Sequence, residues 1–360
     1  MMTRSIPLRV RALIAIAIAA LLSFPAFGQA ISGKDKKAAK KFAEEAKKAY
    51  DRRNYREAVD KYQQSLTLVN LNPEAHYNKG FSHYVLKEND LALAELDTAL
   101  SQNYKPALNV YKIRWGLYSE KKDFDAALGD ITKVLAAEPT NAEALIALGD
   151  INYSKGSYRE AIDAYLKASA KANNNGDLFY WAAKSYSHLG DTNGQLSASG
   201  QAIAKGTKLL GEAHFLQGDA YQKLRKYPEA IDAYNRALAA KPDIYELYGR
   251  MAEIYRSQGK FNHAIDIAKR GLRMFPNDGA FYTDLSLYYS LADRAEDAVQ
   301  AGLAGTKLLP DKYLGYTNLC RAYNDVNKPA LAISACNTAL RLNPNDGETH
   351  FIWAGRTILR

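Results

Sequence analysis

The segment Gly211–Pro242, GEAHFLQGDAYQKLRKYPEAIDAYNRALAAKP, decides the fold because it contains one complete structural repeat. Its apolar residues are spaced three and four apart, which indicates helices rather than strands. The first helix carries Gly218 and the second carries Ala230, with a break at Lys226–Pro228 between them. Pro242 ends the second helix because proline cannot continue it. The segment therefore predicts two short helices joined by a tight turn.

The alanine of the second helix recurs along the chain at intervals of 34 or 35 residues, and one interval of 69 equals two periods. The recurring residues are Ala58, Ala92, Ala127, Ala161, Ala230, Ala264, Ala298 and Ala332. Gln195 occupies the skipped position. A small side chain lets the partner helix approach closely, so we interpret these positions as helix contacts.

The first helix of each pair has a matching small residue. These residues are Ala46, Gly80, Gly149, Ala183, Gly218, Ala252, Ser286 and Cys320. Trp115 is the exception, and Gly116 follows it, so we expect that helix to be rotated or shifted by one residue. An aromatic residue three positions before the alanine is expected to pack in the turn: Tyr55, Phe124, Tyr158, Tyr227 and Phe261.

This 34-residue pattern of glycine, tyrosine, alanine and proline resembles the tetratricopeptide repeat, except at its Trp and Leu positions. The resemblance covers about 320 of the 360 residues. It implies an all-α, right-handed α-solenoid of about nine antiparallel helix pairs plus a C-terminal capping helix. It also implies that the first helices line a concave groove.

The expected organisation follows from the period. A signal peptide (1–30) and a basic arm (31–38) precede repeat units 1–4 (39–176), degenerate unit 5 (177–207), units 6–9 (208–345) and a capping helix (346–360). The fifth unit contains four glycines, each of which weakens a helix by roughly 1 kcal/mol relative to alanine. It is either a decayed repeat or a hinge. In the capping helix, we expect Phe351, Ile352, Trp353 and Ile358 to cover the ninth pair.

Residues 1–30 have the pattern of a secretory signal peptide. Arg4, Arg9 and Arg11 precede an apolar core, Ala12–Leu22, which is shorter than the roughly 20 residues that span a bilayer. Small residues follow, and cleavage after Ala30 or Gly28 fits them. The alternative is an uncleaved anchor. We therefore expect an exported chain, periplasmic or secreted, with no transmembrane span after cleavage.

Positive charge is concentrated near the start of the mature chain. Removing the signal segment lowers the net charge from +9 to +6. Much of the remaining excess lies in Lys34, Lys36, Lys37, Lys40, Lys41, Lys47 and Lys48. Such a run can bind nucleic acid. Interleaved acids and export favour a solvated helix face instead, so no nucleic acid partner is expected.

Cys320 and Cys336 are the two cysteines of the chain. An even count in an exported protein permits a disulfide. However, helix axes usually lie 8–10 Å apart, whereas a disulfide needs Cα atoms within about 7 Å. Two buried thiols are the alternative.

No catalytic pattern occurs in the sequence. The six histidines form no metal-binding helix motif, and no nucleophile elbow or phosphate-binding loop is present. The histidines are His76, His83, His188, His214, His263 and His350. We expect no enzyme activity, no metal site and no cofactor.

The groove lining is predicted from positions three before, one after and four after each small residue, which share one helix face. The first half is aromatic: Tyr50, Tyr77, Phe81, Tyr84, Ile146, Asp150, Tyr153, Tyr180 and Lys184. The second half is polar: Phe215, Asp219, Gln222, Glu253, Arg256, Leu287, Arg321 and Asn324. An exposed aromatic stripe is typical of a binding surface. Alternatively, the tyrosines pack between neighbouring helices.

The expected function is a non-enzymatic interaction scaffold of the cell envelope that binds a peptide or helix in the groove. The alternative is an accessory role in envelope polysaccharide secretion or glycan binding, because aromatic rings stack on sugars. No arginine or lysine clamp array repeats along the groove, so the family's mode of gripping a C-terminal carboxylate is not supported.

Overall fold

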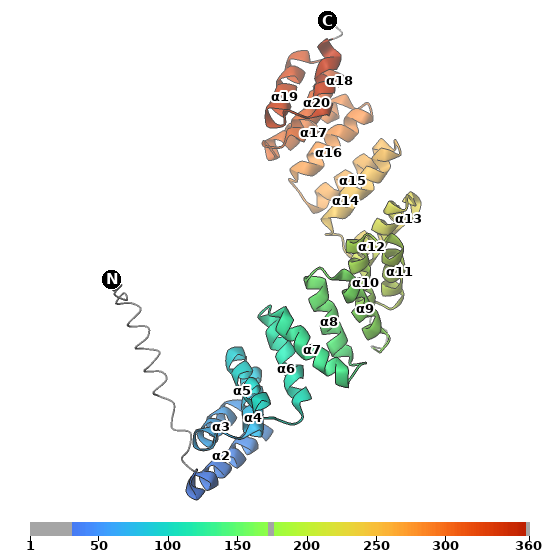
Figure 1. Cartoon of the computed structure of the whole chain (residues 1–360). Helices are drawn as coiled ribbons and strands as arrows, with labels where there is room; N and C mark the ends of the chain where they lie inside the picture. The colour runs from blue at the N-terminus through green and yellow to red at the C-terminus, as the bar shows by residue number, and fades with distance from the viewer. Residues whose placement is uncertain (1–30, 172–175, 358–360) are drawn as a thin grey trace, which may run out of the picture. The chain divides into compact units, whose positions relative to one another are not determined.

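The computed structural model describes residues 31–171 and 176–357, with side chains to residue 354. Within these ranges every regular element is an α-helix (Figure 1). The all-α prediction is therefore confirmed, and helix pairs follow one another as expected for an α-solenoid. The predicted signal peptide lies outside the described residues.

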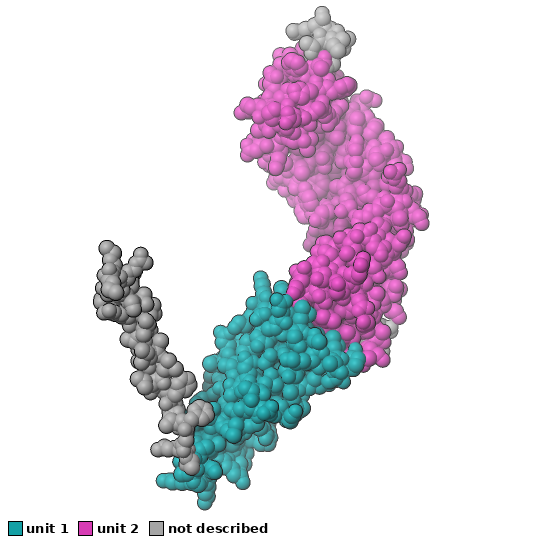
Figure 2. Space-filling model, viewed as in Figure 1, with its two compact units in different colours: residues 1–139 teal, residues 140–360 magenta. Residues whose placement is uncertain are grey.

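The helices divide between two compact units, residues 1–139 and 140–360 (Figure 2). Unit 1 contains three helix pairs, each joined by a short turn. They are α2 (Gly33–Asp51) with α3 (Tyr55–Leu68), α4 (Pro73–Val85) with α5 (Asn89–Ser101), and α6 (Ala107–Glu120) with α7 (Phe124–Ala137). Each pair also packs against the next pair in the unit.

Unit 2 contains six pairs and one further helix, and each pair again packs on its neighbours. The first three pairs are α8 (Ala142–Ser154) with α9 (Tyr158–Ser169), α10 (Gly176–Leu189) with α11 (Thr192–Ala204), and α12 (Leu210–Lys223) with α13 (Tyr227–Ala240). The rest are α14 (Tyr245–Ser257) with α15 (Phe261–Met274), α16 (Gly279–Leu291) with α17 (Ala295–Leu308), α18 (Tyr313–Asp325) with α19 (Pro329–Leu342), and α20 (Gly347–Thr357).

The predicted small positions are the closest contacts within the pairs. All eight second-helix alanines are buried, as are the eight small residues of the first helices. A Cβ atom added to Gly218 would lie 2.4 Å from the ring of Tyr234, and one added to Gly149 would lie 2.5 Å from Tyr165. Both tyrosines follow the repeat alanine by four residues. The small residue thus makes room for this ring.

Each first helix ends in the same way, with a residue of positive φ just beyond its C-terminus. Six of these are not glycine: Arg53, Lys87, Lys122, Arg225, Asp293 and Asn327. The other three are Gly156, Gly190 and Gly259. A left-handed residue at this position satisfies the last carbonyl groups and stops the helix. The turn is therefore set by backbone geometry as well as by the aromatic residue that follows.

Helix α6 is the exception that Trp115 indicated. Neither Trp115 nor Gly116 is fully buried, and α6 buries Val110 and Leu117 instead. Arg114 crosses to α7 and forms two hydrogen bonds with Asp130, of 2.9 and 3.1 Å. Arg114 thus compensates the buried charge of Asp130, because burying an unpaired charge is costly.

Two predictions differ from the structure: where the first helix begins, and which side chains of the last helix cover the ninth pair. Helix α2 begins at Gly33, with Ser32 as its N-cap, so most of the predicted basic arm is helical. Strong helix formers among its lysines and alanines explain this extension. In α20, Phe351 is 79% exposed, so this side chain does not cover the ninth pair as predicted, whereas Trp353 is 42% exposed. Ile352 does pack against it, and Ile358 lies outside the described residues.

The fifth pair, α10 and α11, packs against both α9 and α12. The division between the compact units instead falls at residues 139 and 140, between the third and fourth pairs. The grouping of units 1–4 at residues 39–176 stays a prediction. The hinge at 177–207 stays a prediction, and its glycines do not interrupt either helix.

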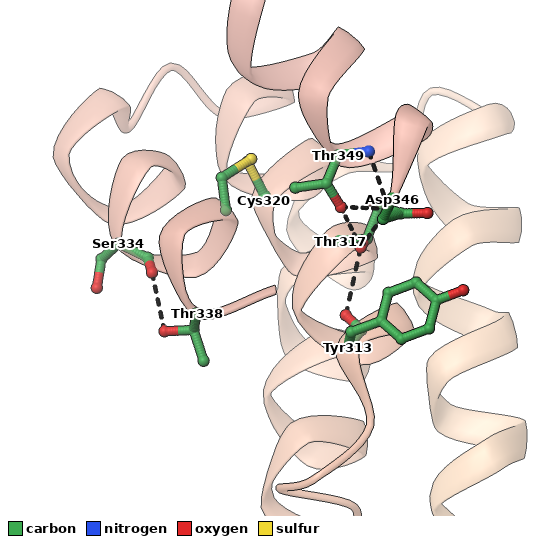
Figure 3. The surroundings of a disulfide bond; sticks show 8 residues. Tyr313, Thr317, Cys320, Ser334, Thr338, Asp346 and Thr349 are labelled. Atoms are coloured by element: carbon green, nitrogen blue, oxygen red, sulfur yellow. Dashed lines mark hydrogen bonds between the residues drawn. A yellow bond between two sulfur atoms is a disulfide. The ribbon is translucent and has the colours of Figure 1, made fainter. Parts of the chain in front are cut away.

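The two cysteines form a disulfide, with their Cα atoms 5.3 Å apart. It joins α18 to α19 within the last pair (Figure 3). Of the two alternatives left open by the sequence, the disulfide is the one found: Cys320 occupies the small position of α18, and its Cα atom lies within the roughly 7 Å that a disulfide requires. One turn before Cys320 on α18, the buried hydroxyl groups of Thr317 and Thr349 lie 2.6 Å apart and connect α18 to α20.

Candidate functional site

Aromatic side chains of α2, α3 and α4 form a continuous cluster in unit 1. Phe81 lies between Tyr50 and Tyr84, with ring centroids 5.6 and 6.1 Å away, and Tyr55 completes the group. All four rings are half-buried. They pack on one another, as the alternative interpretation held, and still present part of their surface on the first helices. We call these four residues the unit 1 aromatic cluster.

Tyr77 lies on the same helix as Phe81 but outside this cluster. Its ring stacks on Tyr104 with centroids 4.5 Å apart. Burial raises the pKa of Tyr77, and it raises the pKa of Tyr104 to about 12. Both hydroxyl groups are therefore neutral at physiological pH and present a mostly apolar surface with a hydrogen-bonding edge.

A second aromatic cluster lies at the start of unit 2, on α8, α9 and α10. Tyr153 contacts both Tyr158 and Trp181, with ring centroids 5.6 and 5.4 Å away. The ammonium of Lys184 lies 4.8 Å from the centre of the Trp181 ring, and the hydroxyl of Tyr153 lies 3.0 Å from Nε2 of His188. These five residues form the α8–α10 cluster.

Three other predicted groove residues of this region lie outside the α8–α10 cluster. Tyr180 is buried, and burial raises its pKa to about 12. Asp150 accepts a 2.8 Å hydrogen bond from the hydroxyl of Tyr165. Ile146 is half-buried on the same helix as Asp150. Tyr180 therefore supports the helix pairs, whereas Asp150 combines its hydrogen bond to Tyr165 with an exposed position.

A pocket in unit 2 lies between α12 and α14 and has a volume of about 390 Å³. Both of these are first helices. The residues that line it are Asp219, Gln222, Lys223, Arg225, Tyr227, Arg250, Glu253, Ile254 and Ser257. The size is within the range of ligand pockets. We call it the α12–α14 pocket.

Asp219 is the centre of the pocket wall and is buried. Lys223 and Arg250 each place a nitrogen 2.7 Å from one of its carboxylate oxygens. Gln195 reaches across from α11 and donates a 2.9 Å hydrogen bond. Burial alone would raise the pKa of Asp219, but these donors outweigh it and the pKa is lowered. The carboxylate therefore stays ionised and fixes two cations.

Further along unit 2, the groove face carries a mixture of charges. Glu253 and Arg256 form a doubly hydrogen-bonded ion pair, at 2.5 and 2.7 Å. The pKa of Asp284 is raised to about 6, first by burial and then by repulsion from the negative charges of Glu253 and Asp278. The positive charge of Arg256 offsets part of this increase. Arg321 forms an ion pair with Glu348 of α20. These residues are consistent with the polar character predicted for this half, whose role as a groove lining stays a prediction.

The sequence interpretation missed the residues that organise the pocket. Arg250, Lys223 and Gln195 were not among the predicted lining residues, and Trp181 was missing from the aromatic half. One signal pointed to the pocket: Gln195 breaks the alanine period. Its side chain is fully buried, so the break is a structural substitution rather than decay.

The described residues contain no group of three or more His, Cys, Asp or Glu side chains placed to hold a metal ion. In the same part of the chain, no helix combines the length and the apolar character that a membrane span requires. What the first helices offer is surface: two half-exposed aromatic clusters and one charged pocket. Together, fold and site define a helix-pair repeat protein that presents a binding surface.

The model of the tetratricopeptide repeat family matches residues 43–107, 117–177, 200–245 and 215–279, which is more than half of the chain. The chain therefore belongs to the tetratricopeptide repeat family. Proteins of this family are protein–protein interaction scaffolds, and this class applies here.

Individual relatives are more distant. A TPR repeat-containing protein of Methanocaldococcus jannaschii is 30% identical over 138 residues, which are 38% of this chain and 24% of that protein. The chain thus spans about a quarter of this curated relative. Among solved structures, the C-terminal part of a TPR repeat-containing protein from Cytophaga hutchinsonii is 20% identical, with a TM-score of 0.49, over 55% of this chain and 79% of that one. YrrB, described as a TPR protein with an unusual peptide-binding site, is 17% identical, with a TM-score of 0.47, over 53% and 98%.

Proposed function

We propose that the chain is a non-enzymatic scaffold of the cell envelope that binds an extended peptide on the face formed by its first helices. The observation that carries this proposal is the pair of half-exposed aromatic clusters. Aromatic side chains supply most of the binding energy at protein interfaces because they bury a large area at little entropic cost. Each cluster contains residues that the sequence predicts to face the groove: Tyr50, Phe81 and Tyr84 in the first, and Tyr153 and Lys184 in the second.

The envelope location is supported by two features of the sequence and structure. Residues 1–30 have the composition of a secretory signal peptide. The only two cysteines are joined in a disulfide, and disulfides persist mainly in oxidising compartments such as the periplasm. A fusion of residues 1–30 to a reporter that is active only after export tests this part of the proposal. An inactive reporter, with the fusion protein retained in the cytoplasm, would refute it.

Peptide binding is tested with random 12-residue peptides displayed on phage and selected on the full chain. The variant Phe81→Ser/Tyr84→Ser removes the exposed rings of the unit 1 aromatic cluster, and Tyr153→Ser/Trp181→Ser does the same for the α8–α10 cluster. We expect each double variant to weaken the selected peptides by about tenfold or more, since hot-spot residues contribute about 2 kcal/mol or more. Leu91→Ser, at an exposed apolar residue of the second helix α5, is the matched control.

Circular dichroism must show unchanged helix content for every variant. Unchanged affinity in both double variants would contradict the proposal. The alternative role, with envelope polysaccharide, can be tested with the same variants. Retention of the full chain on pelleted peptidoglycan or glycan, together with its loss in both double variants, would favour this role over peptide binding.

A further inference from the structure

The break in the alanine period is the starting point. In the eight other pairs, the second helix has alanine at this position, whereas α11 has Gln195. Its amide nitrogen donates to the carbonyl oxygen of Leu216 at 2.8 Å and to Asp219 at 2.9 Å. Its amide oxygen lies 3.2 Å from the ammonium of Lys223. A buried polar side chain whose donor and acceptor groups are all hydrogen-bonded is held rigidly in place.

Gln195 and Asp219 together fix the two cations of the α12–α14 pocket. Lys223 and Arg250 contact Asp219 on one side, while their side chains remain 41% and 40% exposed. The guanidinium of Arg250 also lies 5.3 Å from the ring centre of Phe215. Because both cations are held before any ligand arrives, little side-chain entropy is lost on binding.

The charge balance of the pocket is positive. Lys223 and Arg250 share the single charge of Asp219, and Glu253 is neutralised by Arg256. Arg225 also lines the pocket, is exposed, and has no carboxylate within ion-pair distance among the described residues. The pocket therefore complements an anion.

The surroundings indicate that this anion belongs to a peptide. The pocket lies on α12 and α14, the first helices that also carry Phe215 and Glu253 of the predicted groove lining. A chain bound along that face therefore passes over the pocket. Tyr227 and Ile254 give the pocket an apolar wall beside its cations. The methylene groups of a glutamate side chain complement such a wall.

We propose that the α12–α14 pocket receives an acidic side chain, glutamate or aspartate, of the peptide that the scaffold binds. Arg225, Arg250 and Lys223 supply the counter-charges, and Gln195 acts as a positioning residue through Asp219. This inference rests on the proposed function and adds the chemical class of the partner. It also gives a role to Gln195, the residue that replaces the repeat alanine in the fifth pair.

The test uses the selected 12-residue peptides, each synthesised again with single acidic residues replaced by their amides. Affinities for the full chain are measured by fluorescence anisotropy at 50 and 300 mM NaCl. We expect one acid-to-amide change to weaken binding about fivefold at low salt, and less at high salt because exposed ion pairs are screened. Arg225→Glu should weaken the acidic peptide about tenfold and leave the amide version within twofold.

Arg273→Glu is the control for net charge, since Arg273 is exposed at the end of α15 and does not line the pocket. Gln195→Ala restores the alanine of the repeat and should reduce the preference for the acidic peptide without abolishing binding of the amide version. Circular dichroism checks the fold of each variant.

Several outcomes would overturn the inference. Equal affinity of acidic and amide peptides would refute it while leaving peptide binding intact. An equal loss in Arg225→Glu and Arg273→Glu would reduce the effect to net charge. Binding of inorganic phosphate that depends on Arg225, with no acidic peptide selected, would make the pocket a site for a free anion. If no peptide binds at all, the proposed function fails and the inference fails with it.

Discussion

Replacing Gly218 by alanine tests the packing rule on which the repeat depends. The new Cβ atom would lie 2.4 and 2.5 Å from Cδ1 and Cε1 of Tyr234, closer than real Cβ contacts come. Tyr234 is fully buried, and its hydroxyl donates a 2.7 Å hydrogen bond to Gln222. The ring therefore has no free space to move into, and the two helices must separate.

The expected net effect is a loss of about 2 kcal/mol. Replacing glycine by alanine inside a helix stabilises it by roughly 1 kcal/mol. Overpacking a filled core costs roughly 1–3 kcal/mol, and contacts this short belong near the upper end. The steric cost therefore exceeds the gain in helix propensity.

Thermal and urea unfolding of the full chain, followed by circular dichroism, measures the difference. Gly129→Ala is the matched control, because Gly129 lies inside α7 and a Cβ atom there would meet nothing within 4 Å. We expect Gly129→Ala to be neutral or to stabilise by up to about 1 kcal/mol. Two glycines in helix interiors should thus change stability in opposite directions. If Gly218→Ala stabilises the protein as much as the control does, the assignment of the small position is wrong.

Three further predictions concern stability. Ala230→Leu should overpack α13 and cost roughly 1–3 kcal/mol; an unchanged melting temperature would refute the repeat register. Asp284→Asn should stabilise the chain at pH 7.5 but not at pH 4. The pKa of Asp284 is about 6 in the folded chain and 3.8 ordinarily, so the stability of the folded chain falls as the pH rises from about 4 to 6. The asparagine carries no charge and avoids this loss. The gain is at most about 3 kcal/mol, and melting curves at the two pH values measure it; a gain that is equal at both would exclude titration as the cause. Reducing the disulfide between Cys320 and Cys336 should destabilise the last pair by about 3 kcal/mol, the value for a loop of this length. Melting with and without reductant tests this, and thiol alkylation of the unreduced, denatured chain should find no free thiol.

The repeat was predictable because it depends on residue size at fixed spacing. Gly218 and Ala230 must be small wherever two helices touch, so the period in the sequence records the contact directly. The bounds of α2 were less predictable, since helix propensity in its lysine-rich start adds turns that no repeat position specifies. The disulfide could only be left open, because the average distance between helix axes says little about the Cα distance at one particular pair of positions.

The candidate site could be predicted only in part. Counting from the small residue located Phe81, Tyr84 and Tyr153, since side-chain direction on a helix is fixed by spacing. It did not reveal that Asp219 is buried, because that depends on Gln195 and Arg250 from two other helices. Contacts between residues 24 and 31 positions apart leave no periodic pattern in one sequence.

The central claim is that the first helices form the binding face. Its most direct test is to place a photo-reactive benzoylphenylalanine at each position of a selected peptide, irradiate the complex with the full chain, and map the cross-links by mass spectrometry. We predict cross-links on α2, α4, α8, α10, α12 and α14, with those nearest the acidic residue of the peptide lying around Arg225. Cross-links confined to the second helices, which are the odd-numbered helices from α3 to α19, would contradict the account.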